Sequence, residues 1–142
     1  MPTNPERDWL EQHLRRVLKH LYDPDVLRKS PLVSLLDIDQ RQGIAFTLRS
    51  ALTEAIESHR PGQGIPEDSR TWRIYHILRH RFTEQLTPRE VAADLGLSQR
   101  QLQREEKRAL EVLADDLWTA YHLDAKRSLL AQLLQSDEPE PG

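Results

Sequence analysis

The stretch Leu86–Leu113 reads LTPREVAADLGLSQRQLQREEKRALEVL and decides the fold of the chain. Thr87 can cap a helix that has a proline in its first turn and Glu90 at the capping-box position. Gly96 supplies the backbone freedom that a sharp turn needs, and Ser98 can cap the helix that follows. This order of residue types predicts a helix-turn-helix, a unit whose second helix commonly enters the major groove of DNA.

The helix that begins at Ser98 has an apolar side and a polar side. At about 100° per residue, Ala109 and Leu113 fall beside Leu102 on the side that faces inward. The opposite side carries Arg100, Gln103, Arg104 and Lys107, bordered by Gln99, Gln101 and Arg108. Arg can donate two hydrogen bonds to guanine, Gln can pair with adenine, and both Lys and Arg neutralise phosphates. The pattern favours contact with nucleic acid; the alternative interpretation is an ordinary solvated helix face.

The distribution of charge agrees with a local phosphate contact. The whole chain has a formal net charge of −3. Residues 70–108 contain nine Lys and Arg against five Asp and Glu, whereas the segments before and after them are both acidic. Positive charge therefore gathers on the predicted helix-turn-helix and does not coat the whole protein.

Composition limits the possible classes of protein. The 142 residues suffice for one domain or two small ones. Cysteine is absent, which excludes a disulfide scaffold and thiolate chemistry. No apolar run is long enough to span a membrane, and the N-terminus lacks a signal-peptide pattern. We therefore expect a cytoplasmic protein that has no membrane partner.

Apolar residues recur at helical spacing along most of the chain, and no segment reads as a strand. We expect an all-α fold in which an N-terminal helical subdomain packs on the helix-turn-helix and a long C-terminal helix follows. The predicted boundaries are 1–60 for the subdomain, 61–70 for a linker, 71–113 for the helix-turn-helix, 114–135 for the C-terminal helix and 136–142 for a disordered tail.

Some of these expectations are more detailed. A helix should begin after Asn4, short helices should follow Asp23 and Ser30, and a longer helix should run from Asp39 to His59. The absence of Gly and Pro between residues 97 and 136 predicts nearly continuous helix with a bend near residues 114–116. The three tryptophans, Trp9, Trp72 and Trp118, are expected to anchor the core.

The run of residues 86–113 resembles the promoter-reading helix-turn-helix of bacterial sigma factors, known as region 4. The shared segments are Leu86-Thr87, Glu90-Val91-Ala92, Leu95-Gly96-Leu97-Ser98 and Glu106-Lys107-Arg108-Ala109-Leu110. The resemblance implies base contacts by Gln99, Arg100, Gln101, Gln103 and Arg104, and a phosphate contact by Arg89. Ser98, Lys107 and Arg108 complete the expected DNA-binding set.

Two observations limit this resemblance. Sigma factors usually carry an aliphatic residue where this chain has Glu105, so Glu105 must be exposed or paired, or the unit must pack differently. The segment before residue 86 also lacks the aromatic and basic run of sigma region 2, which argues against a complete sigma factor.

A second resemblance covers the whole chain. The segment 13–36, HLRRVLKHLYDPDVLRKSPLVSLL, followed by the helix-turn-helix, looks like the front module of bacterial multidomain signalling proteins that carry an ATPase domain of histidine-kinase type. This resemblance implies either a stand-alone relative or an excised front end.

Signals for catalysis and metal binding are weak. His76 and His80 have a spacing that can bind zinc, but no third ligand follows at a suitable distance in the sequence. No phosphate-binding glycine loop or nucleophile motif is present. We therefore expect no catalytic residue, no metal site, no cofactor and no enzymatic activity.

Two functions follow from the sequence. The first is a sequence-specific transcription regulator that binds double-stranded DNA. The second is a non-catalytic signalling or protein-interaction module that binds RNA polymerase, a sigma factor or a signalling partner. In either case the leucines after Leu113 could form a homodimer through the C-terminal helix, or pack back onto the N-terminal helices.

Overall fold

The computed structural model describes residues 4–39, 41 and 43–136. Every regular element in these residues is a helix, which confirms the predicted all-α fold. In chain order the elements are α1 (Pro5–Lys19), α2 (Pro24–Lys29), α3 (Leu32–Leu35), α4 (Ile44–Glu57), α5 (Arg70–Leu78), the π-helical turn η1 (Arg79–Thr83), α6 (Pro88–Leu95), α7 (Gln99–Ala120), the 3-10 turn η2 (Leu123–Lys126) and α8 (Arg127–Ser136). No helix in the described part of the chain combines the length and the apolar character needed to cross a membrane.

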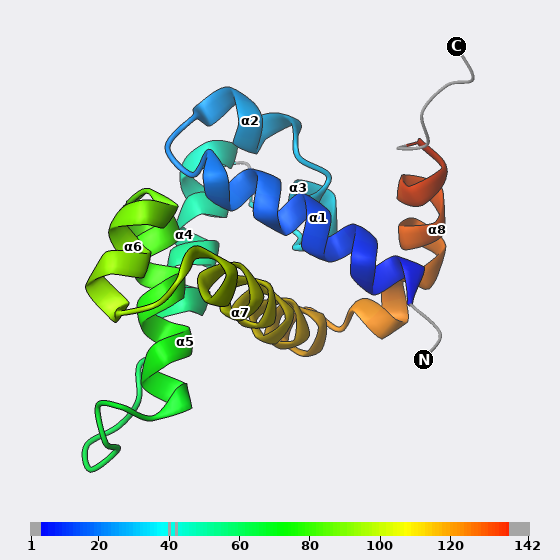
Figure 1. The fold of residues 1–142 in the computed structure, drawn as a ribbon. Helices are drawn as coiled ribbons and strands as arrows, with labels where there is room; N and C mark the ends of the chain where they lie inside the picture. Colours follow the sequence, from blue (N-terminus) through cyan, green and yellow to red (C-terminus); the bar gives the residue numbers. More distant parts are fainter. Residues whose placement is uncertain (1–3, 40, 42, 137–142) are drawn as a thin grey trace.

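Helix α7 occupies the middle of the molecule (Figure 1). α1, α4 and α5 pack against it, and α6 joins its N-terminal end through a tight turn. α8 turns back and lies beside the first turns of α1. The arrangement puts both halves of the chain around one central helix.

Side chains that cap helix N-termini explain where many of the helices begin. Asn4, Asp23, Ser69, Thr87 and Ser98 each accept a hydrogen bond from a backbone N–H in the first turn of the following helix. The helix predicted from Asp39 to His59 is shorter, because it begins only after Gly43, whose φ of 96° is not helical.

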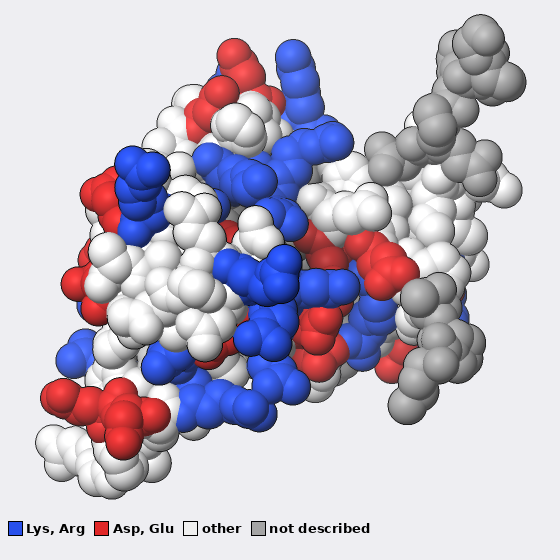
Figure 2. All heavy atoms as spheres, viewed as in Figure 1, with Lys and Arg blue, Asp and Glu red and all other residues white. Residues whose placement is uncertain are grey.

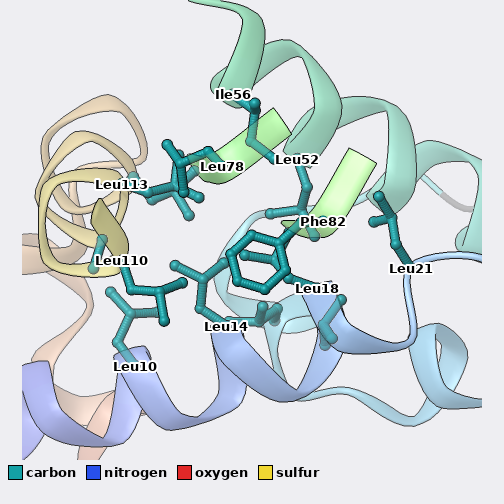
Figure 3. Packing of buried hydrophobic residues seen from close by; sticks show 14 of the residues in the cluster. Leu10, Leu14, Leu18, Leu21, Leu52, Ile56, Leu78, Phe82, Leu110 and Leu113 are labelled. Carbon is teal, nitrogen blue, oxygen red and sulfur yellow. The ribbon is translucent and has the colours of Figure 1, made fainter. Parts of the chain in front are cut away.

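A single hydrophobic core joins the N-terminal helices to the C-terminal half. Figure 3 shows Leu10, Leu14 and Leu18 of α1 lying against Phe82 of η1 and Leu110 of α7. All five side chains are buried and belong to one cluster that also includes residues of α4. Each buried leucine contributes about 1.5–3 kcal/mol relative to an exposed one. The N-terminal subdomain is therefore packed on the helix-turn-helix, as expected.

The three tryptophans have different environments. Trp9 and Trp118 are buried in the core, as predicted. Trp72 is only half-buried, so its assignment as a core anchor was wrong. Its indole Nε1 donates to the carbonyl oxygen of Ile65 at 3.1 Å, which fastens the non-helical segment 60–69 to α5. The predicted linker is thus tied to the helix that follows it.

Helix α7 continues without interruption through residues 114–116, where a bend was predicted, to Ala120. The chain turns instead at His122, whose φ of 52° lies in the left-handed region. The predicted boundary between residues 113 and 114 therefore falls inside one helix. Of the predicted tail, Ser136 ends α8, and residues 137–142 lie outside the described residues.

The turn between α6 and α7 leads to a stability prediction. Gly96→Ala should lower the free energy of unfolding by about 1 kcal/mol, because an alanine strains the left-handed backbone while its Cβ meets open space. Gly62→Ala is the matched control, since Gly62 also faces open space and its φ is not positive. Urea denaturation measures both. Equal effects of the two substitutions would contradict a strained turn at Gly96.

Candidate nucleic-acid interface

The turn between α6 and α7 is stabilised by the backbone conformation of Gly96 and by a backbone hydrogen bond. Gly96 adopts φ 68° and ψ 35°, the left-handed conformation that favours glycine. The N–H of Leu97 donates to the carbonyl oxygen of Ala92 at 2.8 Å, which closes the turn. Val91 and Ala92 are buried beneath it. We call α6, this turn and α7 the helix-turn-helix unit.

Both helices of this unit start with a complete capping box. Thr87 and Glu90 form the predicted one at α6, and Ser98 forms another with Gln101 at α7. The Oε1 of Gln101 accepts from the N–H of Ser98 at 2.9 Å. Gln101 was expected to contact a DNA base, but its carbonyl oxygen is engaged in capping, so only its NH₂ group remains free for a ligand.

The polar side of the first turns of α7 is open to solvent. Arg100, Gln103, Arg104 and Lys107 are exposed, while Leu102 on the opposite side is buried. None of these three basic side chains forms an ion pair with a described residue. The division of α7 into an inward and an outward side is therefore confirmed.

The remaining residues of the predicted DNA-binding set border this side. Gln99 and Arg108 are exposed on α7, Ser98 is exposed at its N-cap, and Arg89 is exposed in the first turn of α6. The first turns of α7 and α6 thus bring all the predicted residues to the surface. Hydroxyl, amide and guanidinium groups of this kind can donate hydrogen bonds to phosphates or bases.

Basic side chains form a band across one face of the molecule. Figure 2 shows Lys and Arg gathered over α1, the near end of α7 and the region where α5 begins, with acidic groups beside them. The exposed basic residues of these elements are Arg15, Arg16 and Lys19 in α1, Arg70 in α5, and Arg100, Arg104, Lys107 and Arg108 in α7. The positive surface is therefore wider than the helix-turn-helix unit from which it was predicted.

Glu105, which the sequence required to be exposed, paired or packed differently, forms an ion pair with Arg73. Its two carboxylate oxygens each accept from Nη1 of Arg73 on α5 at 3.1 Å. Both side chains are about one-third exposed, with values of 33% for Arg73 and 35% for Glu105. Glu105 thus avoids the cost of an unpaired carboxylate by pairing with the preceding helix. This contact replaces the aliphatic packing expected at that position.

A second ion pair lies deeper and was missed by the sequence analysis. The Nε of Arg81 in η1 donates to Oε1 of Glu106 at 3.0 Å, and the side chains are only 11% and 6% exposed. Nη1 of Arg81 also donates to the carbonyl oxygen of Leu86 at 2.8 Å, just before α6. Arg81 therefore joins η1, the entry to α6 and the back of α7. Glu106 stands four residues after Leu102, on the apolar side of α7. An acidic residue at such a position requires a partner, so the sequence could have predicted a buried ion pair here.

The two histidines with zinc-like spacing have other partners. His76 and His80 stack with ring centroids 5.6 Å apart, and Nδ1 of His80 lies 2.5 Å from Oε1 of Glu84. Burial, followed by the nearby His80, lowers the pKa of His76, while the hydrogen bond from His80 lowers the pKa of Glu84. Within the residues that the structure describes, no three potential ligands are grouped to hold a metal ion. Nε2 of His80 also lies 3.5 Å from Oδ2 of Asp94, so the two histidines connect α5, η1 and α6.

Comparisons of the chain with protein-family models, curated proteins and solved structures found no match. The resemblances to sigma factor region 4 and to the front modules of signalling proteins therefore stay predictions. Function must be inferred from the residues of the helix-turn-helix unit and the elements that support it.

The buried ion pair gives the second prediction. Arg81→Ala should lower the free energy of unfolding by about 3–5 kcal/mol, because it leaves the carboxylate of Glu106 buried without its partner. Arg28→Ala breaks the exposed pair with Asp25 and should cost less than about 1 kcal/mol. Thermal and urea unfolding would compare the two variants. A loss for Arg81→Ala as small as that for Arg28→Ala would show that the Arg81–Glu106 pair does not support the fold.

Proposed function

We propose that this protein is a DNA-binding transcription regulator whose α7 enters the major groove. The observation that carries the proposal is the uncovered side of the first turns of α7, where Arg100, Gln103, Arg104 and Lys107 are exposed. None of the basic groups in this set forms an ion pair with a carboxylate of the described chain, although Lys107 interacts electrostatically with Glu11. Unpaired cations at the surface attract a polyanion and release its counterions on contact.

The chemistry of these side chains assigns different tasks to them. Arg100 and Arg104 are suited to bidentate hydrogen bonds with guanine, and Gln103 is suited to adenine. Lys107 and Arg108, farther along α7, and Arg89, at the start of α6, are suited to phosphate oxygens. Base contacts of this kind would supply sequence specificity, whereas the phosphate contacts would fix the position of the unit on the duplex.

A helix that reads DNA must also be held in a fixed orientation by neighbouring elements, because its side chains must keep their positions. Arg73 and Arg81 pair with consecutive residues of α7, Glu105 and Glu106. The core residues Leu102 and Ala109 fix the same segment by packing. A rigid element that presents unpaired donors is the arrangement that favours recognition over a merely solvated surface.

A protein-interaction module is the second candidate, and one observation favours it. Tyr22 and Phe46 are 55% and 54% exposed, and the guanidinium of Arg49 lies near both rings, 5.8 and 6.0 Å from their centroids. Exposed aromatic and arginine side chains are enriched in protein interfaces. The homodimer proposed through α8 has less support, because Leu129, Leu133 and Leu134 are already half-buried against the core.

Binding to duplex DNA separates these two functions. Wild-type protein should bind a fluorescently labelled random-sequence duplex with an affinity that falls steeply as salt increases, because several phosphate contacts release counterions. Arg100→Ala should weaken binding by about tenfold at low salt, the loss expected for a charge-assisted hydrogen bond. Fluorescence anisotropy across a salt series measures both effects. In vitro selection from a random duplex pool then tests for sequence preference.

Arg60→Ala is the matched control for that experiment. It removes the same charge from an exposed residue. Arg60 directly follows His59, which pairs with Asp116 of α7. Asp116 lies about 24 Å along α7 from Arg100, so Arg60 is far from the proposed DNA-binding side. DNA affinity should be unchanged in this variant. Equal affinities of the wild type and the Arg100→Ala variant would end the DNA-binding proposal and leave the Tyr22–Phe46 surface as the candidate.

A further inference from the structure

A groove separates α5 from the outward side of α7. Its volume is about 510 Å³, within the range of pockets that hold small molecules. One wall is the side of α5 that carries Arg70, Arg73, Ile74 and Ile77. The other wall consists of side chains from the first four turns of α7. The groove therefore lies directly beside the surface proposed to contact DNA.

The groove is strongly positive. Arg70, Arg104, Lys107 and Arg108 line it, and none of them pairs with a carboxylate of a described residue. Two other lining residues, Arg73 and Glu105, neutralise each other, which leaves Glu111 as the one unpaired acidic lining group. Several guanidinium groups around one recess suit an anion that carries more than one charge, such as a di- or triphosphate.

The groove also has an apolar part. Ile74 is half-buried and lines the recess on the α5 side, while Ile77, which also borders it, is fully buried and presents no surface to a ligand. An apolar surface next to a set of cations suits a ligand that has a flat or apolar body and a phosphate tail. A purely solvated cluster of basic residues would have no such surface.

We propose that this groove is a nucleotide-binding site. Arg70 of α5 and Arg104, Lys107 and Arg108 of α7 hold the phosphates, while Ile74 contacts the base. We assign the site to a free nucleotide because the recess between the two helices has the size of a small-molecule pocket.

The position of the site has a regulatory consequence, which rests on the proposed function. Gln101, Arg104, Lys107 and Arg108 belong both to the groove and to the predicted DNA-binding set. A bound nucleotide neutralises Arg104, Lys107 and Arg108 and occupies part of the surface that a duplex would need. Nucleotide and DNA should therefore compete, so that the nucleotide acts as a negative effector of DNA binding.

Isothermal titration calorimetry with the full chain tests the site without DNA. ATP in metal-free buffer should bind the wild type, and Arg70→Ala should weaken that binding by about tenfold, because it removes a charged donor to phosphate. Arg60→Ala is the control, since Arg60 is exposed and does not line the groove. Circular dichroism confirms that both variants are folded. Inorganic tripolyphosphate should bind more weakly than ATP, because it lacks a base.

Each result is decisive for the proposal. No ATP binding by the wild type, or equal losses in the two variants, would overturn the site. Tripolyphosphate that binds as tightly as ATP would overturn its assignment to a nucleotide. Suppose that Arg70→Ala weakens ATP binding but neither the wild type nor any variant binds duplex DNA. The nucleotide site is then supported, and the DNA-binding proposal fails. If ATP displaces labelled duplex from the wild type and not from Arg70→Ala, both stand.

Discussion

The buried pair between Arg81 and Glu106 is the interaction on which the rest of this structure depends. Arg81 lies in a π-helical turn, and its guanidinium reaches both the carboxylate of Glu106 and the carbonyl oxygen of Leu86. One side chain thereby fixes the start of the helix-turn-helix unit and the back of α7. Next to it, Phe82 enters the core shared with α1. The same short turn therefore holds the two halves of the protein together and sets the orientation of α7.

Helix α7 combines two roles because its two sides differ in chemistry. Its inward side fills the core from Leu102 to Trp118, while the outward side of its first turns keeps basic and amide groups in solvent. Two acidic residues of α7, Glu105 and Glu106, pair with arginines of neighbouring elements, whereas Glu111 forms no ion pair with a described residue. The two pairs occupy these carboxylates, so that they do not pair with the exposed basic side chains of α7. The result is a positive face on a protein whose net charge is −3.

Short-range features of the fold could be predicted from the sequence, and long-range ones could not. Thr87, Gly96 and Ser98 act within a few residues of their own position, so their types alone indicated the caps and the turn. The pairs of Glu105 and Glu106 join residues 32 and 25 positions apart, and only the packing of helices brings them together. The turn at His122 could not be predicted from the sequence either, because a histidine and not a glycine adopts the left-handed conformation there. The exposed basic side of α7 was predictable, whereas the groove it forms with α5 required the structure.

The central claim is that the uncovered side of α7 binds duplex DNA. The most direct measurement is a ¹H–¹⁵N NMR titration of the full chain with a short DNA duplex at low salt. Shifts that concentrate on backbone amides of residues 98–108 and on Arg89 are the predicted result. Shifts that concentrate around Tyr22 and Phe46, or no shifts at all, would contradict the claim.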